Sequence, residues 1–119
     1  MNHVNWLLLF SLITLSISSH SQEMLKIENA WINEAPPNVT TLAGYCRIQN
    51  NNVIELILEK VESAEFNNIE IHQSVTENGI AKMIKQDHIS IHPSSEVLFE
   101  PGGLHLMLFD PKRPVKKGN

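Results

Sequence analysis

Gly102-Gly103-Leu104-His105-Leu106-Met107-Leu108 is the stretch of sequence that decides the fold. Leucine recurs at every second position after a Pro-Gly-Gly turn signal, which is the period of a β-strand with one buried face. Side chains alternate between the faces of a strand, so the leucines face the core while His105 and Met107 share the opposite face. Three buried leucines leave no packing need for that methionine. A histidine and a methionine side by side instead suggest half of a soft-metal site.

The rest of the chain repeats this pattern of short apolar runs between turn signals. Further strands are predicted at Leu25–Ile32, Ala43–Gln49, Val53–Val61, Ile69–Gln73, Ile80–Lys85, His88–His92 and Glu96–Phe99. Asn78-Gly79 is the strongest hairpin signal, because these residue types tolerate the positive φ angles of a two-residue turn. No apolar stripe of helical period follows residue 22. The pattern predicts an all-β fold, an antiparallel sandwich or barrel.

Residues 1–21 are predicted to be a secretory signal peptide and not part of the fold. The apolar run from Trp6 to Ile17 is short for a membrane-spanning helix. Ser19-His20-Ser21 places small residues where a signal peptidase cleaves, which makes Gln22 the expected mature N-terminus. A retained N-terminal membrane anchor is the alternative, because the segment before the apolar run carries no Lys or Arg. Residues 22–119 are then predicted to form one small domain with a single core.

Composition excludes several classes of protein. The net charge of −4 argues against nucleic-acid binding, which requires clustered basic side chains. Cys46 is the single cysteine, so an internal disulfide framework cannot stabilise the fold. The strand pattern places its thiol on the same face as Ile48. We therefore expect a small buried hydrophobe and not a reactive thiol.

Partners for His105 and Met107 are expected on the hairpin around Asn78-Gly79. In the strand before it, the isoleucines face one side and His72 faces the other. If the turn has two residues, His72 pairs with Lys85 across the hairpin. Met83 then lies on the same face, diagonal to His72 and within reach of a shared ion.

Two histidines and two methionines predict a particular metal chemistry. Thioether sulfur is a soft ligand suited to copper(I), and imidazole tolerates both copper oxidation states. Four neutral ligands favour a monovalent ion, whereas zinc or iron would recruit carboxylate or thiolate ligands. A single methionine in a β-protein is more often a core residue. Two His/Met pairs on predicted outer faces make a copper site the better hypothesis.

The spacing His72-x10-Met83-x21-His105-x-Met107 resembles the H-x10-M-x21-H-x-M signature of the PCuAC-type periplasmic copper chaperones. The resemblance spans about residues 25–118. Its surroundings match as well, at Asn29-Ala30-Trp31-Ile32, Ala35-Pro36-Pro37, Ala43-Gly44-Tyr45, Ile69-Glu70-Ile71-His72 and Pro101-Gly102-Gly103-Leu104-His105-Leu106-Met107-Leu108.

This resemblance implies a cupredoxin-like Greek-key barrel or sandwich that binds copper(I), with copper(II) left open, at an exposed site. The ligands carried over by position are His72, Met83, His105 and Met107. The resemblance also implies a periplasmic, non-enzymatic carrier, expected to be a monomer. It would deliver copper to the CuA subunit of cytochrome c oxidase or act alongside a Sco-type thiol protein.

Two departures from that family pattern stand out. Many relatives have a second methionine directly after the first histidine, where this chain has Gln73. The family's domain also usually continues with two more strands, so we expect either a fragment or a barrel that lacks its last strands, with an exposed edge.

Alternative functions remain open at this point. A blue-copper electron carrier would need Cys46 as a thiolate ligand, which its predicted core-facing position disfavours. His88 and His92 could capture copper(II) or zinc weakly, although exposed histidines are usually no site at all. A secreted non-metal β-sandwich for interaction or scaffolding, and a copper-sequestering tolerance protein, are two further possibilities. An enzyme is least expected, since no nucleophile–base pair or carboxylate dyad is evident.

Overall fold

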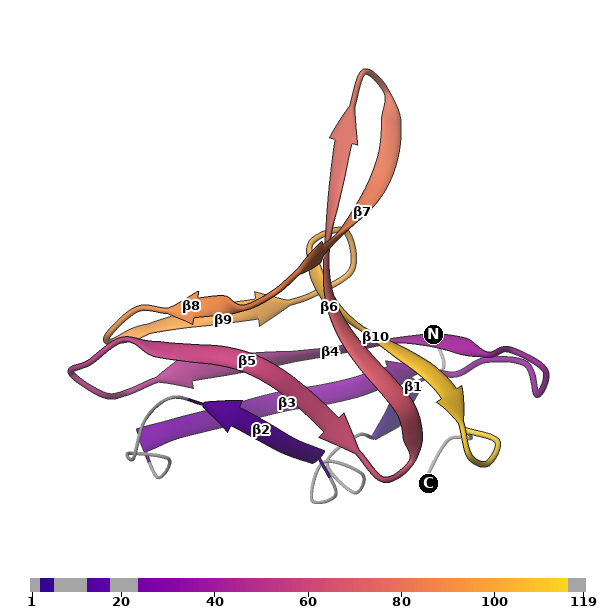
Figure 1. The fold of residues 1–119 in the computed structure, drawn as a ribbon, viewed down its shortest axis with the longest axis horizontal. Helices are drawn as coiled ribbons and strands as arrows, with labels where there is room; N and C mark the ends of the chain where they lie inside the picture. The colour runs from indigo at the N-terminus through magenta and orange to yellow at the C-terminus, as the bar shows by residue number, and fades with distance from the viewer. Residues whose placement is uncertain (1–2, 6–12, 18–23, 116–119) are drawn as a thin grey trace.

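The computed structural model of the chain describes residues 3–5, 13–17 and 24–115, which form an all-β protein (Figure 1). The regular secondary structure of residues 25–115 consists of strands. The strands of the described ranges are β1 (His3–Asn5), β2 (Ile13–Ile17), β3 (Leu25–Asn33), β4 (Thr41–Asn50), β5 (Leu56–Ser63), β6 (Phe66–Glu77), β7 (Ile80–Gln86), β8 (Ile89–Ile91), β9 (Ser95–Phe99) and β10 (Leu104–Pro111).

The strands form two sheets. The seven-stranded sheet has the order β1-β3-β4-β9-β10-β6-β7, and the three-stranded sheet has the order β2-β5-β8. Strands β9 and β10 lie end to end along β4, because Phe99 pairs with Cys46 and Leu106 pairs with Gly44. Residues 100–103 loop out between them, and β10 continues between β4 and β6. The predicted antiparallel cupredoxin-like sandwich is confirmed, with two open sheets and no closed barrel.

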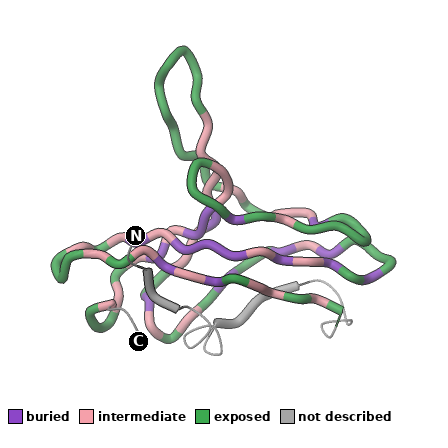
Figure 2. Tube along the Cα trace, turned by 180° about the vertical axis from the view of Figure 1, so that it is seen from behind, coloured by how far each residue is buried: buried purple, intermediate pink, exposed green. Residues whose placement is uncertain are grey.

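The core lies between the two sheets and contains the face predicted from the leucine pattern. Leu106 and Leu108 are 2% and 0% exposed, and Leu104 packs against them from the partly buried margin. From the three-stranded sheet, Leu56, Leu58 and other residues fill the opposite side. Figure 2 shows the buried segments concentrated in the middle of the layered body, with exposed loops at its ends. The core face and the opposite face of β10 are thus fixed by packing.

Strand boundaries differ from the predicted ones where long-range contacts decide them. The strand predicted from Val53 begins only at Leu56, because the preceding residues form a turn around the Asn50 side chain. The strand predicted at Ile69–Gln73 extends over Phe66–Glu77, because β10 and β7 pair with it on its two sides. Local sequence pattern cannot report such pairing partners.

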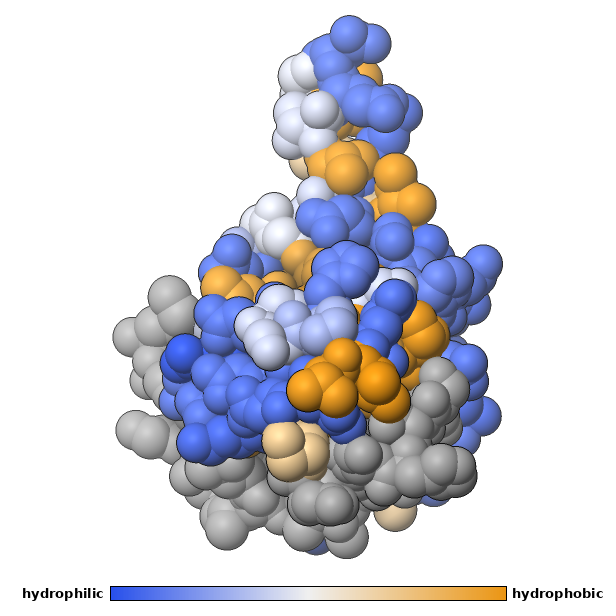
Figure 3. Space-filling view, turned by 90° about the vertical axis from the view of Figure 1, so that its left-hand side faces the viewer, coloured by the Kyte–Doolittle hydropathy of each residue, from blue (hydrophilic) through white to orange (hydrophobic). Residues whose placement is uncertain are grey.

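The hairpin of β6 and β7 has the predicted two-residue turn. Asn78 and Gly79 adopt φ angles of 52° and 77°, and Glu77 pairs with Ile80. The hairpin extends past the last residue of β6 that pairs with β10, so its outer part projects from the body (Figure 1). The projecting arm carries three exposed hydrophobic side chains, Ile80, Met83 and Ile84. Figure 3 shows hydrophobic surface, in orange, on this arm.

The predicted signal peptide, residues 1–21, lies largely outside the described residues. The two pieces that are described, β1 and β2, pair through their backbones with β3 and β5 respectively. Whether the segment is removed after export stays a prediction. Among the described residues, the structure contains no helix with the length and apolar character needed to cross a bilayer.

Candidate metal centre

The two predicted histidine ligands face each other across the centre of the seven-stranded sheet. His72 of β6 and His105 of β10 are direct cross-strand partners, and their ring centroids are 5.9 Å apart. On the other side of β6, Lys85 of β7 is the direct partner of His72, as the sequence predicted from the two-residue turn. Both rings lie on the face opposite the leucine core, which agrees with the alternation along each strand.

The two predicted methionine ligands lie on the same face as the histidines. Met107 follows His105 on β10 after one residue, and Met83 pairs with Ser74, two residues beyond His72 on β6. Met83, His105 and Met107 line a common open hollow of about 260 Å³. His72 does not line this hollow, but its ring centroid lies 5.9 Å from that of His105, which does. The structure thus brings the four predicted residues to one region of the sheet.

Exposure differs sharply among these residues, whereas the family resemblance implies an exposed site. Only 4% of His105 is exposed, against 15% of the His72 side chain and 61% of Met83. His105 is covered because β10 is an internal strand with β4 and β6 on its two sides. Met83 is open to solvent because β7 is an edge strand in the projecting hairpin. The candidate site therefore has a buried end and an open end.

Hydrogen bonds determine which nitrogen of each ring is available. His72 Nε2 lies 2.9 Å from Glu70 Oε1, and His105 Nδ1 lies 3.1 Å from the Gly103 carbonyl oxygen. A carboxylate and a carbonyl can only accept, so both ring nitrogens are the protonated donors. In each neutral imidazole the other nitrogen then carries a lone pair. These nitrogens are His72 Nδ1 and His105 Nε2.

Both of these lone-pair nitrogens are buried and have no hydrogen-bond partner. Within the part of the chain that the structure describes, the only other buried side-chain polar atom without a partner is Asn52 Nδ2. An unsatisfied buried polar atom costs about 1–3 kcal/mol, so two on adjacent residues call for an explanation. A metal ion bound by both nitrogens would supply the missing interaction. The residues present therefore fit a metal site.

Much of the wall of the hollow is apolar, with Leu42, Tyr45 and Pro101 among its lining residues. Tyr45 lines the hollow, is 7% exposed, and packs against Trp31 with ring centroids 4.5 Å apart. Burial raises the pKa of the Tyr45 phenol, and a hydrogen bond with Asn33 opposes this shift in part. Tyr45 is therefore a neutral neighbour at physiological pH and not an anionic ligand.

The ligand types in this region suit a soft ion. Among the described residues, no three His, Cys, Asp or Glu side chains gather at one point. A four-ligand set from His72 and His105 thus requires the thioethers of Met83 and Met107. Thioether and imidazole donors together select copper(I) over zinc, which prefers thiolate, imidazole and carboxylate ligands.

The alternative ligands considered from the sequence lie elsewhere. His88 and His92 flank β8 of the other sheet and are both exposed. Cys46 is 4% exposed in the core, and burial raises the pKa of its thiol to about 12. The thiol is thus protonated and lies on the core face, away from the histidine rings. A blue-copper centre with Cys46 as thiolate ligand does not fit this arrangement.

Glu70 is a site residue to which the sequence interpretation gave no role. Its hydrogen bond with His72 is the largest cause of a lowered Glu70 pKa, and Lys85 lowers the pKa further. The carboxyl is therefore ionised at neutral pH. Its position two residues before His72, on the same strand face, was the signal that could have identified it.

Two open sheets with histidines and methionines on the outer face of the larger sheet define a cupredoxin-like β-sandwich domain. The chain belongs to the LpqE-like family, since the model of that family, described as "Putative lipoprotein LpqE-like", matches residues 25–119.

Two curated relatives are similar to this chain at the sequence level. "Uncharacterized protein RP573" of Rickettsia prowazekii (strain Madrid E) is 34% identical over 82 residues, covering 68% of this chain and 45% of the relative. "Putative lipoprotein Lxx21020" of Leifsonia xyli subsp. xyli (strain CTCB07) is 26% identical over 95 residues, covering 79% of this chain and 56% of the relative. The chain thus spans about half the length of these relatives.

Solved structures with the same fold are PCuAC domains. The "Copper-bound PCuAC domain from PmoF2" superposes with a TM-score of 0.63 at 27% identity, covering 76% of this chain and 69% of that one. The "apo PmoF2 PCuAC domain" gives a TM-score of 0.59 at 26% identity, covering 83% and 71%. The "Apo PCuAC domain from PmoF1", at 22% identity and a TM-score of 0.62, covers 78% and 73% and supports the fold alone. The PCuAC-type resemblance is confirmed.

Proposed function

We propose that this protein is a copper(I)-binding metallochaperone of the bacterial periplasm. Its ligands are His72 Nδ1, His105 Nε2 and the thioethers of Met83 and Met107. The observation that carries the proposal is the pair of buried, unpartnered imidazole nitrogens on facing strands, beside two methionines on the same sheet face. The copper carried by one PCuAC domain of the same fold, at 27% identity, supports the choice of metal.

The mechanism of loading follows from the ligand types and their surroundings. Soft neutral donors stabilise a monovalent copper ion without adding ligand charge. The apolar wall of the hollow, with Tyr45 at 7% exposure, limits access of water to the buried end of the site. The imidazoles at that end are held by hydrogen bonds, so they need little reorganisation when copper binds.

Release begins at the open end of the site. Met83 is 61% exposed on the projecting hairpin, so a ligand from an acceptor protein can displace its thioether first. His105, at 4% exposure, remains bound until the acceptor has gained other contacts to the ion. Such stepwise exchange suits transfer to the CuA subunit of cytochrome c oxidase or to a Sco-type thiol protein.

Competition titration tests the binding site. The reduced, metal-free protein is titrated with copper(I) against a chromophoric chelator, beside Met83→Ala, Met107→Ala and the control Met24→Ala. Met24 is an exposed methionine before β3 and outside the site, so its removal should leave the affinity unchanged. Wild-type affinity weaker than micromolar, or equal affinity in all four proteins, would contradict the proposal.

Transfer distinguishes a carrier from a copper-sequestering protein. The copper-loaded protein is mixed with a metal-free CuA domain, the two proteins are separated after increasing times, and the copper bound to each is measured by metal analysis. Delivery predicts transfer faster than spontaneous dissociation into an equally strong chelator. Retention of the copper by the protein would favour sequestration. A parallel titration with copper(II) shows whether the four ligands also accept the oxidised ion.

A further inference from the structure

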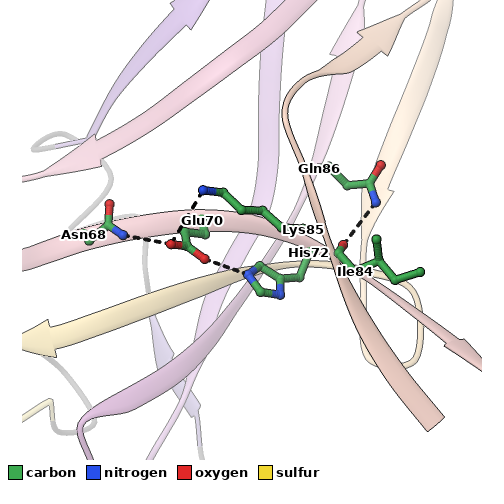
Figure 4. Close-up of polar contacts among 6 residues, drawn as sticks. All are labelled: Asn68, Glu70, His72, Ile84, Lys85 and Gln86. Carbon is green, nitrogen blue, oxygen red and sulfur yellow. Dashed lines mark hydrogen bonds and ion pairs between the residues drawn. The ribbon is translucent and has the colours of Figure 1, made fainter. Parts of the chain in front are cut away.

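Glu70 holds the His72 ring by a hydrogen bond along its own strand. The two side chains lie on the same face of β6, and Glu70 Oε1 is 2.9 Å from His72 Nε2 (Figure 4). Since the ionised carboxylate can only accept, His72 Nε2 must be protonated. The lone pair of the neutral ring is then on Nδ1, the buried nitrogen without a partner.

The other oxygen of the Glu70 carboxylate accepts one hydrogen bond and forms an ion pair. Asn68 Nδ2 lies 3.1 Å from Oε2, and Lys85 Nζ lies 3.8 Å from the same atom. Lys85 comes from β7, where it is the direct cross-strand partner of His72. With Oε2 engaged by Asn68 and Lys85, Oε1 is left to accept from His72. Figure 4 shows these three contacts converging on one carboxylate.

The second histidine is held differently. His105 Nδ1 donates to a neutral backbone oxygen, that of Gly103, at 3.1 Å. The two rings therefore present opposite nitrogens to the site: Nδ1 from His72 and Nε2 from His105. One ring has an anionic partner and the other a neutral one. A carboxylate partner fixes the tautomer of a ligating histidine and makes the ring a stronger donor.

We propose that Glu70 is the positioning residue that selects the tautomer of His72 and thereby presents Nδ1 to copper. This inference rests on the proposed copper site. Glu70 does not bind the ion; it acts through His72 and is kept in place by Asn68 and Lys85. Loss of the carboxylate would let His72 sample the other tautomer, in which Nδ1 carries a proton and cannot bind a metal.

The first test is made on the metal-free protein, so it does not depend on copper. Long-range ¹H–¹⁵N NMR at about pH 8, where an ordinary imidazole is neutral, reports which ring nitrogen is protonated. We expect a single Nε2-protonated form of His72 in the wild type and a mixture of tautomers in Glu70→Ala. His105 should keep its Nδ1 proton in both proteins, because its partner is the Gly103 carbonyl. A change in both rings would indicate general disruption and overturn the inference.

The second test measures copper(I) affinity. Removal of a carboxylate that holds a ligating histidine typically lowers metal affinity by about 10- to 100-fold, and we expect this for Glu70→Ala. Glu70→Gln preserves shape and one acceptor oxygen, so its affinity should lie between those of Glu70→Ala and the wild type. Glu77→Ala is the matched control: it removes a carboxylate from the same strand, one that pairs with Lys82 at 3.1 Å, and should bind like the wild type.

The outcomes separate this inference from the proposed function. If the wild type binds copper(I) tightly and Glu70→Ala binds equally well, or if His72 keeps a single Nε2-protonated form in Glu70→Ala, the role of Glu70 is wrong while the copper site stands. If the wild type does not bind copper(I), the proposed function fails, and the metal-related half of the inference fails with it. A tautomer mixture together with lowered affinity supports both.

Discussion

His72 and His105 face each other on β6 and β10 with their ring centroids 5.9 Å apart, and each leaves one buried nitrogen without a partner. In the metal-free protein this arrangement is a cost, because buried polar atoms normally form hydrogen bonds. The same two nitrogens are the ones available to an ion between the strands. If copper binds there as proposed, function and stability oppose each other at this point of the sheet, as is usual for binding sites.

Replacement of His105 by leucine is expected to stabilise the metal-free protein by about 1 kcal/mol while abolishing tight copper(I) binding. The substitution removes the unpartnered Nε2 from a position that is 4% exposed. The Gly103 carbonyl oxygen does not lose its last hydrogen bond, because it also accepts from the Ser74 amide at 3.1 Å. Urea unfolding measures the change, with the exposed His92→Leu as control. An unfolding free energy of His105→Leu below that of the wild type would show that the unpartnered His105 Nε2 does not destabilise the protein.

Asn50 is expected to be the most sensitive polar residue for stability. It is 0% exposed, and its Nδ2 donates to the carbonyl oxygens of Ile54, Ile91 and His92 at 2.9, 2.9 and 3.1 Å. Asn50→Ala would remove all three hydrogen bonds, although Ser95 Oγ would still donate to the His92 carbonyl at 2.7 Å, and should cost about 2–4 kcal/mol. Chemical denaturation measures the unfolding free energy of Asn50→Ala, with a substitution of the exposed Asn67, Asn67→Ala, as control. Equal stability of the two variants would contradict the assignment.

The buried thiol of Cys46 predicts both a reactivity and a pH dependence. Its pKa is raised from 9.0 to about 12 by burial, so the folded protein should react slowly with thiol reagents at about pH 8 and rapidly once unfolded. A raised folded-state pKa contributes stability that is complete below the unfolded-state value and is lost as pH rises. The unfolding free energy should therefore fall between pH 9 and about 12.

Cys46→Ala provides the control for that dependence. The variant has no thiol to ionise, so the part of the slope due to Cys46, up to about 1.4 kcal/mol per pH unit, should disappear. Its unfolding free energy is compared with that of the wild type across the same pH range. Identical slopes, or rapid labelling of the folded wild type, would show that the thiol is accessible.

Much of the fold was predictable because it depends on local pattern. Alternation along β10 fixed the core face, and Asn78-Gly79 fixed the register that pairs His72 with Lys85. The burial of His105 was not predictable, because it depends on β4 lying beside β10. That pairing joins Met107 to Ala43, which are far apart in sequence. Alternation separates the two faces of a strand but does not reveal whether the strand is internal or at an edge.

The role proposed for Glu70 illustrates a second limit of sequence interpretation. The spacing of Glu70 and His72 placed both on one face, but the contact depends on side-chain rotamers. The Glu70 carboxylate also accepts from Asn68 at 3.1 Å and pairs with Lys85 of the neighbouring strand at 3.8 Å. A ligand motif identifies the candidate ligands, whereas their supporting hydrogen bonds emerge only from the assembled sheet.

Removal of the predicted signal peptide is expected to affect the stability of the fold but not its copper(I) binding. Removal of residues 1–21 would delete β1 and β2 and leave the edges of β3 and β5 without their backbone partners. Copper(I) affinity should be unchanged, because the candidate ligands lie on β6, β7 and β10. Mass spectrometry of the exported protein should find Gln22 at the N-terminus. An intact N-terminus on the exported protein would instead support a retained membrane anchor.

Strain in the hairpin turn should affect copper binding without affecting the core. Gly79 has a φ of +77°, and a side chain added at this position would meet no other atom within 4 Å of its Cβ. A substitution there therefore acts through backbone conformation alone. Gly79→Val places a β-branched residue in the left-handed region, which costs about 1–2 kcal/mol. Asparagine tolerates this conformation, so Gly79→Asn is the control. Met83 moves with the hairpin, so Gly79→Val should weaken copper(I) binding by up to about tenfold.

The free energy of global unfolding should barely change in Gly79→Val, because the outer part of the hairpin has few core contacts. Amide hydrogen exchange should increase only in the hairpin. Wild-type affinity in Gly79→Val with increased exchange in the hairpin would show that Met83 is not a ligand.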